Sequence, residues 1–380
     1  MEIASTITGP RRRKGWRVAG SAVLVTAVIG VSAAPARADD GGQHRVTVTQ
    51  TNLVANRDGL GAALVDPDLQ NPWGMSKFPG APVWVSNNHT SSSTLYLGGS
   101  AAAPTSVTKV PLTVSMAGTP TGQVANGAAG FNLTNGSSAR FIFATEQGQL
   151  FGWNGPAGTT AEQRALVAGA NYKGLAEGSV DTSTFLYAAD FANGGHIDVF
   201  DSAWNMVNWP GAFHVRRLPA GFAPFNVQVL RDANGAERLF VAYAKVDPAT
   251  GDEVKGQGLG LVVEFTTDGE FVRRFSRGSM NAPWGLAYAP ASWGRAAGDL
   301  LVGQFGNGQI EMFNPETGRH TGTVRDGQHH KLAIDGLWAL MAGDASSGGD
   351  GTVLFTAGPN EEADGLYGVL TFVAPSHHDD

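Results

Sequence analysis

The sequence contains no cysteine. Disulfide bonds and thiolate-based zinc sites are therefore excluded, and the fold has to be held together by its apolar core. Charged residues make up only 16% of the chain, and the 26 basic residues are outnumbered by 33 acidic ones. This balance argues against a nucleic-acid-binding protein, whose surface would carry a basic patch that attracts phosphate.

Catalytic motifs with a fixed spacing are also missing. The chain has no G-x-S-x-G elbow and no H-E-x-x-H helix. Its glycine-rich KGQGLGL run (255–261) does not stand between a strand and a helix, as a phosphate-binding loop would. Beyond the first 38 residues there is no long apolar run, so we expect no stable membrane insertion of the mature chain.

Residues 1–38 have the pattern of a cleaved signal peptide. Basic residues between Arg11 and Arg17 precede an apolar stretch (18–34), and Ala36-Arg37-Ala38 resembles a small-residue cleavage site. The alternative is a membrane anchor, for which the apolar stretch is short. We expect a secreted protein, by the Sec or the Tat route. Removal of this segment takes away six basic residues and one acidic one, which leaves 20 basic and 32 acidic residues.

Six stretches of similar make-up follow one another about every fifty residues. The first strands are predicted at 73–76, 129–133, 174–177, 226–230, 284–288 and 336–340. The second strands are predicted at 82–88, 140–146, 184–190, 238–244, 299–305 and 352–358, and the third at 94–98, 149–153, 196–200, 261–265, 309–313 and 366–372. A recurring all-β unit of this length predicts a six-bladed β-propeller.

Each blade of such a propeller needs a fourth, outer strand. Five candidates occur, at 106–114, 163–168, 206–218, 269–275 and 318–327, but the sixth unit has none. The alternating stretch at 45–55 belongs to no unit, so we predict that this N-terminal strand pairs with 366–373 and closes the ring. The prediction is a single propeller domain over 39–373, followed by a disordered tail at 374–380.

The loops between second and third strands carry most of the polar side chains. In a propeller these loops surround one mouth of the central channel, where a small ligand would bind. The predicted ligand-binding residues are Asn87, Trp73, Tyr243, Trp284, Gln304, Asn307 and Asn360. For the two tryptophans, the alternative is a role as apolar wedges between neighbouring blades.

Two further hypotheses concern chemistry at this mouth. Oxygen ligands for Ca²⁺ or Mg²⁺ are available from Glu146, Asp190, Asn226 and Asn87, although such residues also cap strand ends. The imidazole of His89 is placed to act as a general base, or it is a solvated turn residue. A catalytic group would then consist of His89, Glu146 and Asp190.

The NPWG (71–74) and APWG (282–285) segments and the LYAAD strand end (186–190) resemble six-bladed, NHL-like propellers. Residues 46–373, and 51–76 in particular, are similar to a family of secreted bacterial proteins without an assigned activity. More distant similarity to gluconolactonase and regucalcin propellers implies a channel-bound divalent metal, with Asp190 and Asn226 as two ligands. The glutamate of that family has no counterpart at 71–73, and the His/Glu pair of the streptogramin lyases is not matched.

Two classes of function follow from these patterns. The first is a secreted propeller that binds an extracellular small molecule, glycan or peptide at its polar channel face. The second is a divalent-metal-assisted hydrolase or lyase of lactone or glycoside type at the same mouth. Because propellers host many unrelated functions, the fold alone does not choose between the two.

Overall fold

The computed structural model describes residues 44–192, 194–232, 234–275 and 278–374, all within the unit Gly41–Asp380. The predicted signal peptide (1–38) lies outside these residues, as does the predicted tail apart from Ala374. The fold is all-β. The helices in the described part are 3₁₀ turns, and none is long and apolar enough to cross a membrane. These turns are η1 (Asn88–Thr90), η2 (Pro104–Ser106), η3 (Gly155–Ala157) and η4 (Gly294–Ala296).

Most strands form four-stranded antiparallel sheets in chain order. The first sheet contains β3 (Pro72–Ser76), β4 (Val83–Asn87) and β5 (Ser92–Ser100), and both β6 (Thr108–Ser115) and β24 (Ser347–Gly348) pair with β5. The second contains β7 (Pro120–Ala125), β8 (Phe141–Thr145), β9 (Gln149–Trp153) and β10 (Glu162–Leu166). The third contains β11 (Tyr172–Val180), β12 (Ser183–Asp190), β13 (His196–Asp201) and β14 (Met206–Val207). The fourth contains β15 (Phe222–Arg231), β16 (Glu237–Lys245), β17 (Gly260–Phe265) and β18 (Phe271–Phe275).

The remaining strands form one longer sheet that contains the N-terminal strand. It runs from β19 (Pro283–Tyr288), β20 (Leu300–Gln304), β21 (Ile310–Phe313) and β22 (His320–Arg325) through β1 (Val46–Ala55) to β26 (Leu366–Phe372), β25 (Thr352–Ala357) and β23 (Leu337–Ala342), and β2 (Leu64–Val65) pairs with β1. The predicted closure is confirmed, because β1 pairs antiparallel with β26 from Val48 to Ala55. The structure adds a short parallel pairing of β1 with β22 at Val46 and Thr47, which joins two four-stranded units into one sheet.

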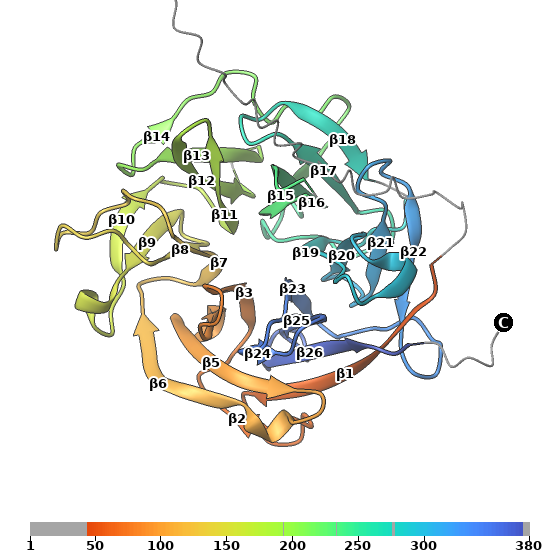
Figure 1. The fold of residues 1–380 in the computed structure, drawn as a ribbon. Coiled ribbons are helices and arrows are strands. Elements are labelled where there is room, and N and C mark those ends of the chain that lie inside the picture. The colour runs from red at the N-terminus through yellow and green to blue at the C-terminus, as the bar shows by residue number, and fades with distance from the viewer. Residues whose placement is uncertain (1–43, 193, 233, 276–277, 375–380) are drawn as a thin grey trace, which may run out of the picture. The chain divides into compact units, whose positions relative to one another are not determined.

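The innermost strands follow one another around a common centre (Figure 1). Each innermost strand contacts the next one in the order β3, β7, β11, β15, β19 and β23, and β23 in turn contacts β3. Middle strands such as β4, β8 and β20 are buried along their whole length, since a neighbouring sheet covers each of their faces. These features define a β-propeller.

The predicted first strand of the second unit, at 129–133, is wrong. The innermost strand there is β7, and 129–133 is a loop whose Phe131 has a left-handed backbone, with φ 48°. Phe131 and Leu133 are buried because the loop packs against Trp204, whose Nε1 donates to the Asn132 carbonyl at 3.0 Å. The apolar residues of 129–133 therefore belong to a buried loop that packs between two sheets, and they do not form a strand.

The predicted outer strand at 206–218 is also mostly wrong. Only Met206 and Val207 belong to β14, and the chain from 208 to 221 leaves the sheet before β15 begins. The other four predicted outer strands correspond to β6, β10, β18 and β22.

Candidate functional site

The innermost strands approach one another so closely that side chains are excluded at matched positions. A Cβ on Gly74 would lie 3.1 Å from Gly122 Cα, and one on Gly122 would lie 2.8 Å from Gly174 Cα. A Cβ on Gly174 would lie 2.7 Å from Asn226 Cα, so glycine is required along this part of the ring. The residues just before the matched positions of the six innermost strands are Trp73, Thr121, Lys173, Phe225, Trp284 and Trp338.

Four of these residues form an aromatic plug, which consists of Trp73, Phe225, Trp284 and Trp338. Trp73 stacks on Trp338 with ring centroids 3.6 Å apart, and Trp284 meets both rings edge-on at 6.1 and 5.9 Å. Phe225 lies 6.4 Å from Trp73 across the ring of strands. Each plug residue is at most 3% exposed, so Trp73 and Trp284, both predicted to bind ligand, present almost no surface for stacking.

Beyond the plug the channel is narrow. A cavity of about 30 Å³ is lined by Gly74, Gly122, Leu175, Asn226, Leu286 and Ala339, one residue from each innermost strand. This volume has room for water alone. Within the channel, a ligand larger than water would therefore have to lie above the plug, at the mouth that the loops after the second strands surround.

Lys173 is the charged residue among the six that precede the matched positions, and it lies beside the plug. Its Nζ is 5.2 Å from the centre of the Trp73 ring and 2.7 Å from Glu146 Oε1. Asp252 Oδ1 lies 3.6 Å from the same Nζ. Only 3% of the Lys173 side chain is exposed. A buried ammonium group is thus held by carboxylates from the two neighbouring sheets.

Glu146 follows β8 and is fixed by neutral donors as well as by the lysine. Its Oε2 accepts hydrogen bonds from Asn88 Nδ2 at 3.1 Å and from Thr119 Oγ1 at 2.9 Å. Burial raises the pKa of Glu146, but Lys173 and these donors outweigh burial and hold it below its ordinary value. Glu146 is therefore ionised at neutral pH.

Glu253 lies in the β16–β17 loop, which turns back toward the mouth. A bridge between Val246 and Glu253 and a 2.7 Å hydrogen bond from Val254 N to the Lys245 carbonyl hold this part of the loop. Burial raises the pKa of Glu253 to about 7, because it outweighs the attraction of Lys173 and is reinforced by Glu362 and Asp252.

The pKa of Lys173 responds to the same group of charges. Burial alone would lower it, but Glu146, Glu253 and Asp252 raise it, and the net direction is upward. The ammonium is therefore charged, and it sits between one carboxylate that is ionised and another that titrates near neutral pH.

Glu362 reaches the cluster from the loop after β25. Asn360, Glu361 and Glu362 all have left-handed backbones, with φ of 59°, 52° and 69°. Glu362 Oε2 accepts a hydrogen bond from Asn71 Nδ2 at 2.8 Å, and Asn71 itself has φ 44°. Three successive left-handed residues without glycine are costly, and such strain is concentrated at functional sites. We name Lys173, Glu146, Asp252, Glu253 and Glu362 the Lys173 cluster.

The predicted base His89 lies on the same mouth. Its Nε2 is 3.4 Å from Asn71 Nδ2, and the side chain is exposed in η1. Asn71 also accepts a 2.9 Å hydrogen bond from the indole Nε1 of Trp338, so it links His89, Glu362 and the plug. His89 is thereby connected to the Lys173 cluster through Asn71.

Asp190, predicted as a ligand or catalytic residue, belongs to another group. Its Oδ1 accepts from the backbone N–H groups of Asn171 and Ala192, each at 2.9 Å, and the residue is fully buried. The ligand atoms of Asp190, His196 and Asp198 all lie within 4.8 Å of one another, and within the described ranges this is the one acidic or histidine trio so grouped. Asp198 also accepts a 2.7 Å hydrogen bond from the Tyr172 hydroxyl.

The other two predicted metal ligands make contacts within the fold. Asn87 Nδ2 donates to Ser92 Oγ and Thr94 Oγ1 at 3.2 and 3.0 Å. Asn226 Nδ2 donates to the Trp284 carbonyl at 2.7 Å. The four predicted metal ligands thus take part in four different sets of hydrogen bonds, and their role as a common cation site stays a prediction.

The remaining predicted ligand-binding residues are spread around the mouth. Gln304 is buried, and its Oε1 accepts from Asn281 N at 2.6 Å. Tyr243 is buried among apolar side chains. Asn307 is exposed and caps Gln309 N, and the exposed Asn360 donates from its backbone to Asp335 Oδ2. Their part in ligand binding stays a prediction.

Sequence reasoning missed Lys173, Asn71, Asp252, Glu253 and Glu362. One signal was available for Lys173, since the residue before the matched glycine or asparagine is aromatic in Trp73, Phe225 and Trp284. A lysine in that position is out of pattern. No local pattern marks the other four residues, because loops from different sheets bring them together.

Comparisons with known proteins place the chain beside two viral proteins over most of its length. No family model matches the chain. The chain is 34% identical to Uncharacterized protein L690 of Acanthamoeba polyphaga mimivirus over 84% of each chain. It is 32% identical to Uncharacterized protein R648 of the same virus, over 87% of this chain and 82% of that one. The chain belongs to the family that contains these two proteins.

Similar solved structures have low sequence identity. One is described as a streptogramin B lyase, with 12% identity, a TM-score of 0.44, and coverage of 86% of this chain and 98% of that one. Another is a structural genomics protein of unknown function from Bacteroides thetaiotaomicron, with 12% identity, a TM-score of 0.49, and coverage of 86% and 76%. The relatives reported above are viral, so they do not support the expectation of a bacterial family.

Proposed function

We propose that this chain is an exported, six-bladed β-propeller that binds a small ligand rich in hydroxyl or amino groups, such as a glycan, at the Lys173 cluster. The six cyclically contacting innermost strands support the blade count. The pattern of residues 1–38 supports export. The composition of the cluster supports the ligand class, because it holds four carboxyl groups, from Glu146, Asp252, Glu253 and Glu362, against the single ammonium group of Lys173.

The observation that carries the proposal is the buried charge of Lys173. Removing an ammonium and carboxylates from water costs several kcal/mol per ion, and packed apolar residues of similar volume would often be at least as stable. Lys173 Nζ already lies near the rings of Trp73 and Phe191, so an apolar residue in its place would extend the plug. A charged group at a position that an apolar residue could fill is typical of a functional site. The shifted pKa values of the neighbouring carboxyl groups and the strained backbone of the surrounding loops are typical of one as well.

An oligosaccharide array with the purified protein tests this proposal. We expect retention of one group of glycans by the wild type, and its loss in Glu362→Gln and in Asp252→Asn, which leave Lys173 in place and change partly exposed carboxylates. Arg231→Met, which removes an exposed partner of Glu237 far from the mouth, serves as the matched control. An array without retained glycans, or binding that survives both substitutions, would contradict the proposal.

A hydrolase or lyase is the second candidate. Glu253 favours it, because a carboxyl group with a pKa of about 7 beside a charged lysine can accept and return a proton at neutral pH. The Asp190, His196 and Asp198 group favours a metal-assisted version, in which those side chains would supply oxygen and nitrogen ligands. The roles of Glu146, Asn87 and Asn226 as ligands remain part of this second proposal.

Lactone and glycoside panels, run with EDTA and then with Ca²⁺ or Mg²⁺, test the enzyme. Turnover that falls about 100-fold or more in Glu253→Gln, with Glu237→Gln unchanged, would identify the base. Turnover abolished by EDTA and by Asp198→Asn would identify the metal. If the wild type is inactive under all of these conditions, the enzyme proposal is contradicted and only the binding proposal remains.

A further inference from the structure

A second candidate binding site lies away from the channel, where the chain between β14 and β15 folds over the next sheet. Phe213 N donates to the Gly269 carbonyl at 2.8 Å, which ties this connection to the β17–β18 hairpin. A Cβ on Gly269 would lie 2.6 Å from Ala212 Cβ, and Gly269 has φ +88°. The hairpin therefore needs glycine at this point to accept the connection.

Aromatic side chains fix both walls. The Trp209 ring lies 4.9 Å from Phe185 and 6.4 Å from Tyr187, and Phe213 lies 5.5 Å from Phe265. The Tyr187 hydroxyl donates to the Thr267 carbonyl at 2.7 Å, which fastens the hairpin from below. The connection is thus anchored to sheets on both sides, and the space it encloses is preformed.

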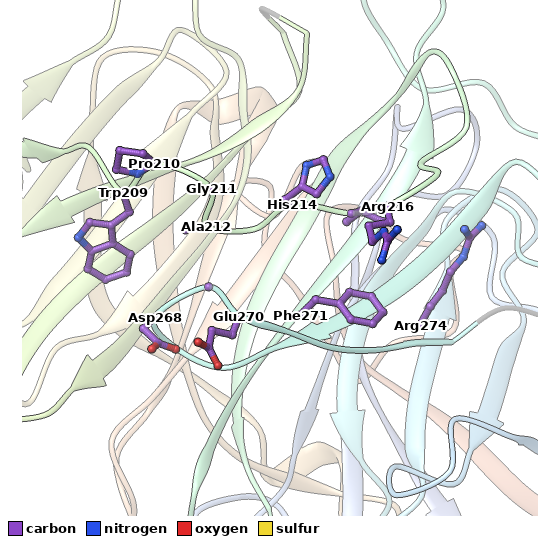
Figure 2. A pocket seen from close by; sticks show the side chains of 12 residues that line it. Trp209, Pro210, Gly211, Ala212, His214, Arg216, Asp268, Glu270, Phe271 and Arg274 are labelled. Carbon is purple, nitrogen blue, oxygen red and sulfur yellow. The ribbon is translucent and has the colours of Figure 1, made fainter.

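That space is an outer cavity of about 630 Å³, within the usual range for small-molecule sites. Figure 2 shows its main side chains: Trp209, Arg216, Asp268, Glu270, Phe271 and Arg274. Phe271 is 51% exposed and lines the cavity, so its ring offers apolar surface to a bound molecule. In Figure 2 this exposed ring lies on the other side of the cavity from the half-buried indole of Trp209.

The charges in the outer cavity are separated. In Figure 2 the guanidinium groups of Arg216 and Arg274 lie on the side of Phe271, whereas the carboxylates of Asp268 and Glu270 lie toward Trp209. Among the described residues neither arginine has a carboxylate oxygen within 4.0 Å, and the buried Nε of Arg274 has no hydrogen-bond partner. Uncompensated arginines are notable in a chain with excess acid, because they form a local positive surface.

We propose that the outer cavity binds a small monocarboxylate with a flat apolar ring. The ring would pack on Phe271, and Arg216 and Arg274, which lie on the same side of the cavity, would bind the carboxylate. Planar guanidinium groups suit a carboxylate through paired N–H donors. The opposite wall, with Asp268 and Glu270, disfavours a second negative charge and so selects a monoanion over a phosphate dianion. This site is independent of the Lys173 cluster.

Isothermal titration calorimetry with phenylacetate tests the proposal. Phenylacetamide keeps the ring without the charge, acetate keeps the charge without the ring, and phenyl phosphate replaces the carboxylate by a dianion. We expect saturable binding of one phenylacetate, and binding at least about 10-fold weaker for the other three compounds. Tighter binding of phenyl phosphate, or no heat from phenylacetate at millimolar concentration, would overturn the assignment.

Substitutions then locate the bound molecule. Arg216→Gln changes an exposed side chain and should weaken phenylacetate at least about 10-fold while leaving phenylacetamide unchanged. Phe271→Ser should weaken both compounds. Arg231→Gln, which alters an arginine paired with Glu237 elsewhere, should match the wild type. Equal affinity of wild type and Arg216→Gln for phenylacetate would overturn the proposed site.

Discussion

The Lys173 cluster draws its side chains from loops and strands of four sheets, whereas the outer cavity is formed by one connection and the neighbouring hairpin. In the cluster, the buried ammonium of Lys173 is paired with the partly exposed carboxylate of Glu146. In the cavity, the charges of Arg216 and Arg274 are left unpaired among the described residues. The Lys173 cluster is therefore built into the ring of sheets, whereas the outer cavity lies on the surface of that ring.

This difference predicts in which region a substitution changes both the stability of the fold and ligand binding. A change in the Lys173 cluster disturbs charges that were buried when the ring of sheets formed, so it should affect folding and binding together. A change in the outer cavity removes a contact to solvent or ligand and should affect binding alone. Three measurements, from the largest expected effect to the smallest, test this contrast.

The first measurement concerns the aromatic plug beneath the Lys173 cluster. Trp338→Ala removes a fully buried ring that stacks on Trp73 and Phe305, and it should lower the free energy of unfolding by about 3–5 kcal/mol. Urea denaturation measures this. Phe271→Ala in the outer cavity is the matched aromatic control, and we expect a change within about 0.5 kcal/mol. If both variants lose the same free energy of unfolding, the contrast between the buried plug and the surface cavity is wrong.

The second measurement removes the buried ammonium group. Lys173→Met leaves Glu146 without its cation and should destabilise the protein by about 3 kcal/mol. The double variant Lys173→Met/Glu146→Gln should recover part of this loss, since no uncompensated charge remains. Arg216→Gln should stay within about 0.5 kcal/mol of the wild type. If the double variant is no more stable than Lys173→Met, the loss does not come from the stranded carboxylate.

The third measurement is the dependence of stability on pH. The pKa of Glu253 is about 7 in the folded chain and 4.5 for the ordinary group, so the native state holds the proton longer than the unfolded state. Between these values the free energy of unfolding contributed by Glu253 falls as the pH rises. Glu253→Gln should therefore be more stable than the wild type at pH 7.5, and the difference should shrink toward pH 4.5. A difference that is constant with pH would show that Glu253 ionises normally.

The architecture was largely predictable, because alternation and apolar runs record which strands are covered on both faces. The pairing of 45–55 with the last strand followed from the missing outer strand of the sixth unit, and it is confirmed. The strand β7 was missed because its sequence, PTGQVA, is shaped by close approach around the channel and contains little apolar surface. The buried loop residues Phe131 and Leu133 carried the stronger apolar signal and misled the assignment.

The candidate site was less predictable. His89 and Glu146 were expected at the mouth, and both lie there, but the burial of Lys173 depends on a plug built from four separate strands. The pKa of Glu253 depends on a loop that turns back across the channel. Such properties arise from contacts between distant segments, and local residue patterns do not record them.

The pairing of β1 with β26 also sets an order of events during synthesis. Val48 and Phe372 are paired in the sheet but lie far apart in the sequence. During synthesis, the N-terminal strand therefore has no antiparallel partner until the last strand has been made. Contacts between residues so far apart in the chain form slowly. Until then the edges of β1 and β22 are open to pairing with other chains, and a chaperone that covers residues 46–55 would protect the nascent protein from aggregation.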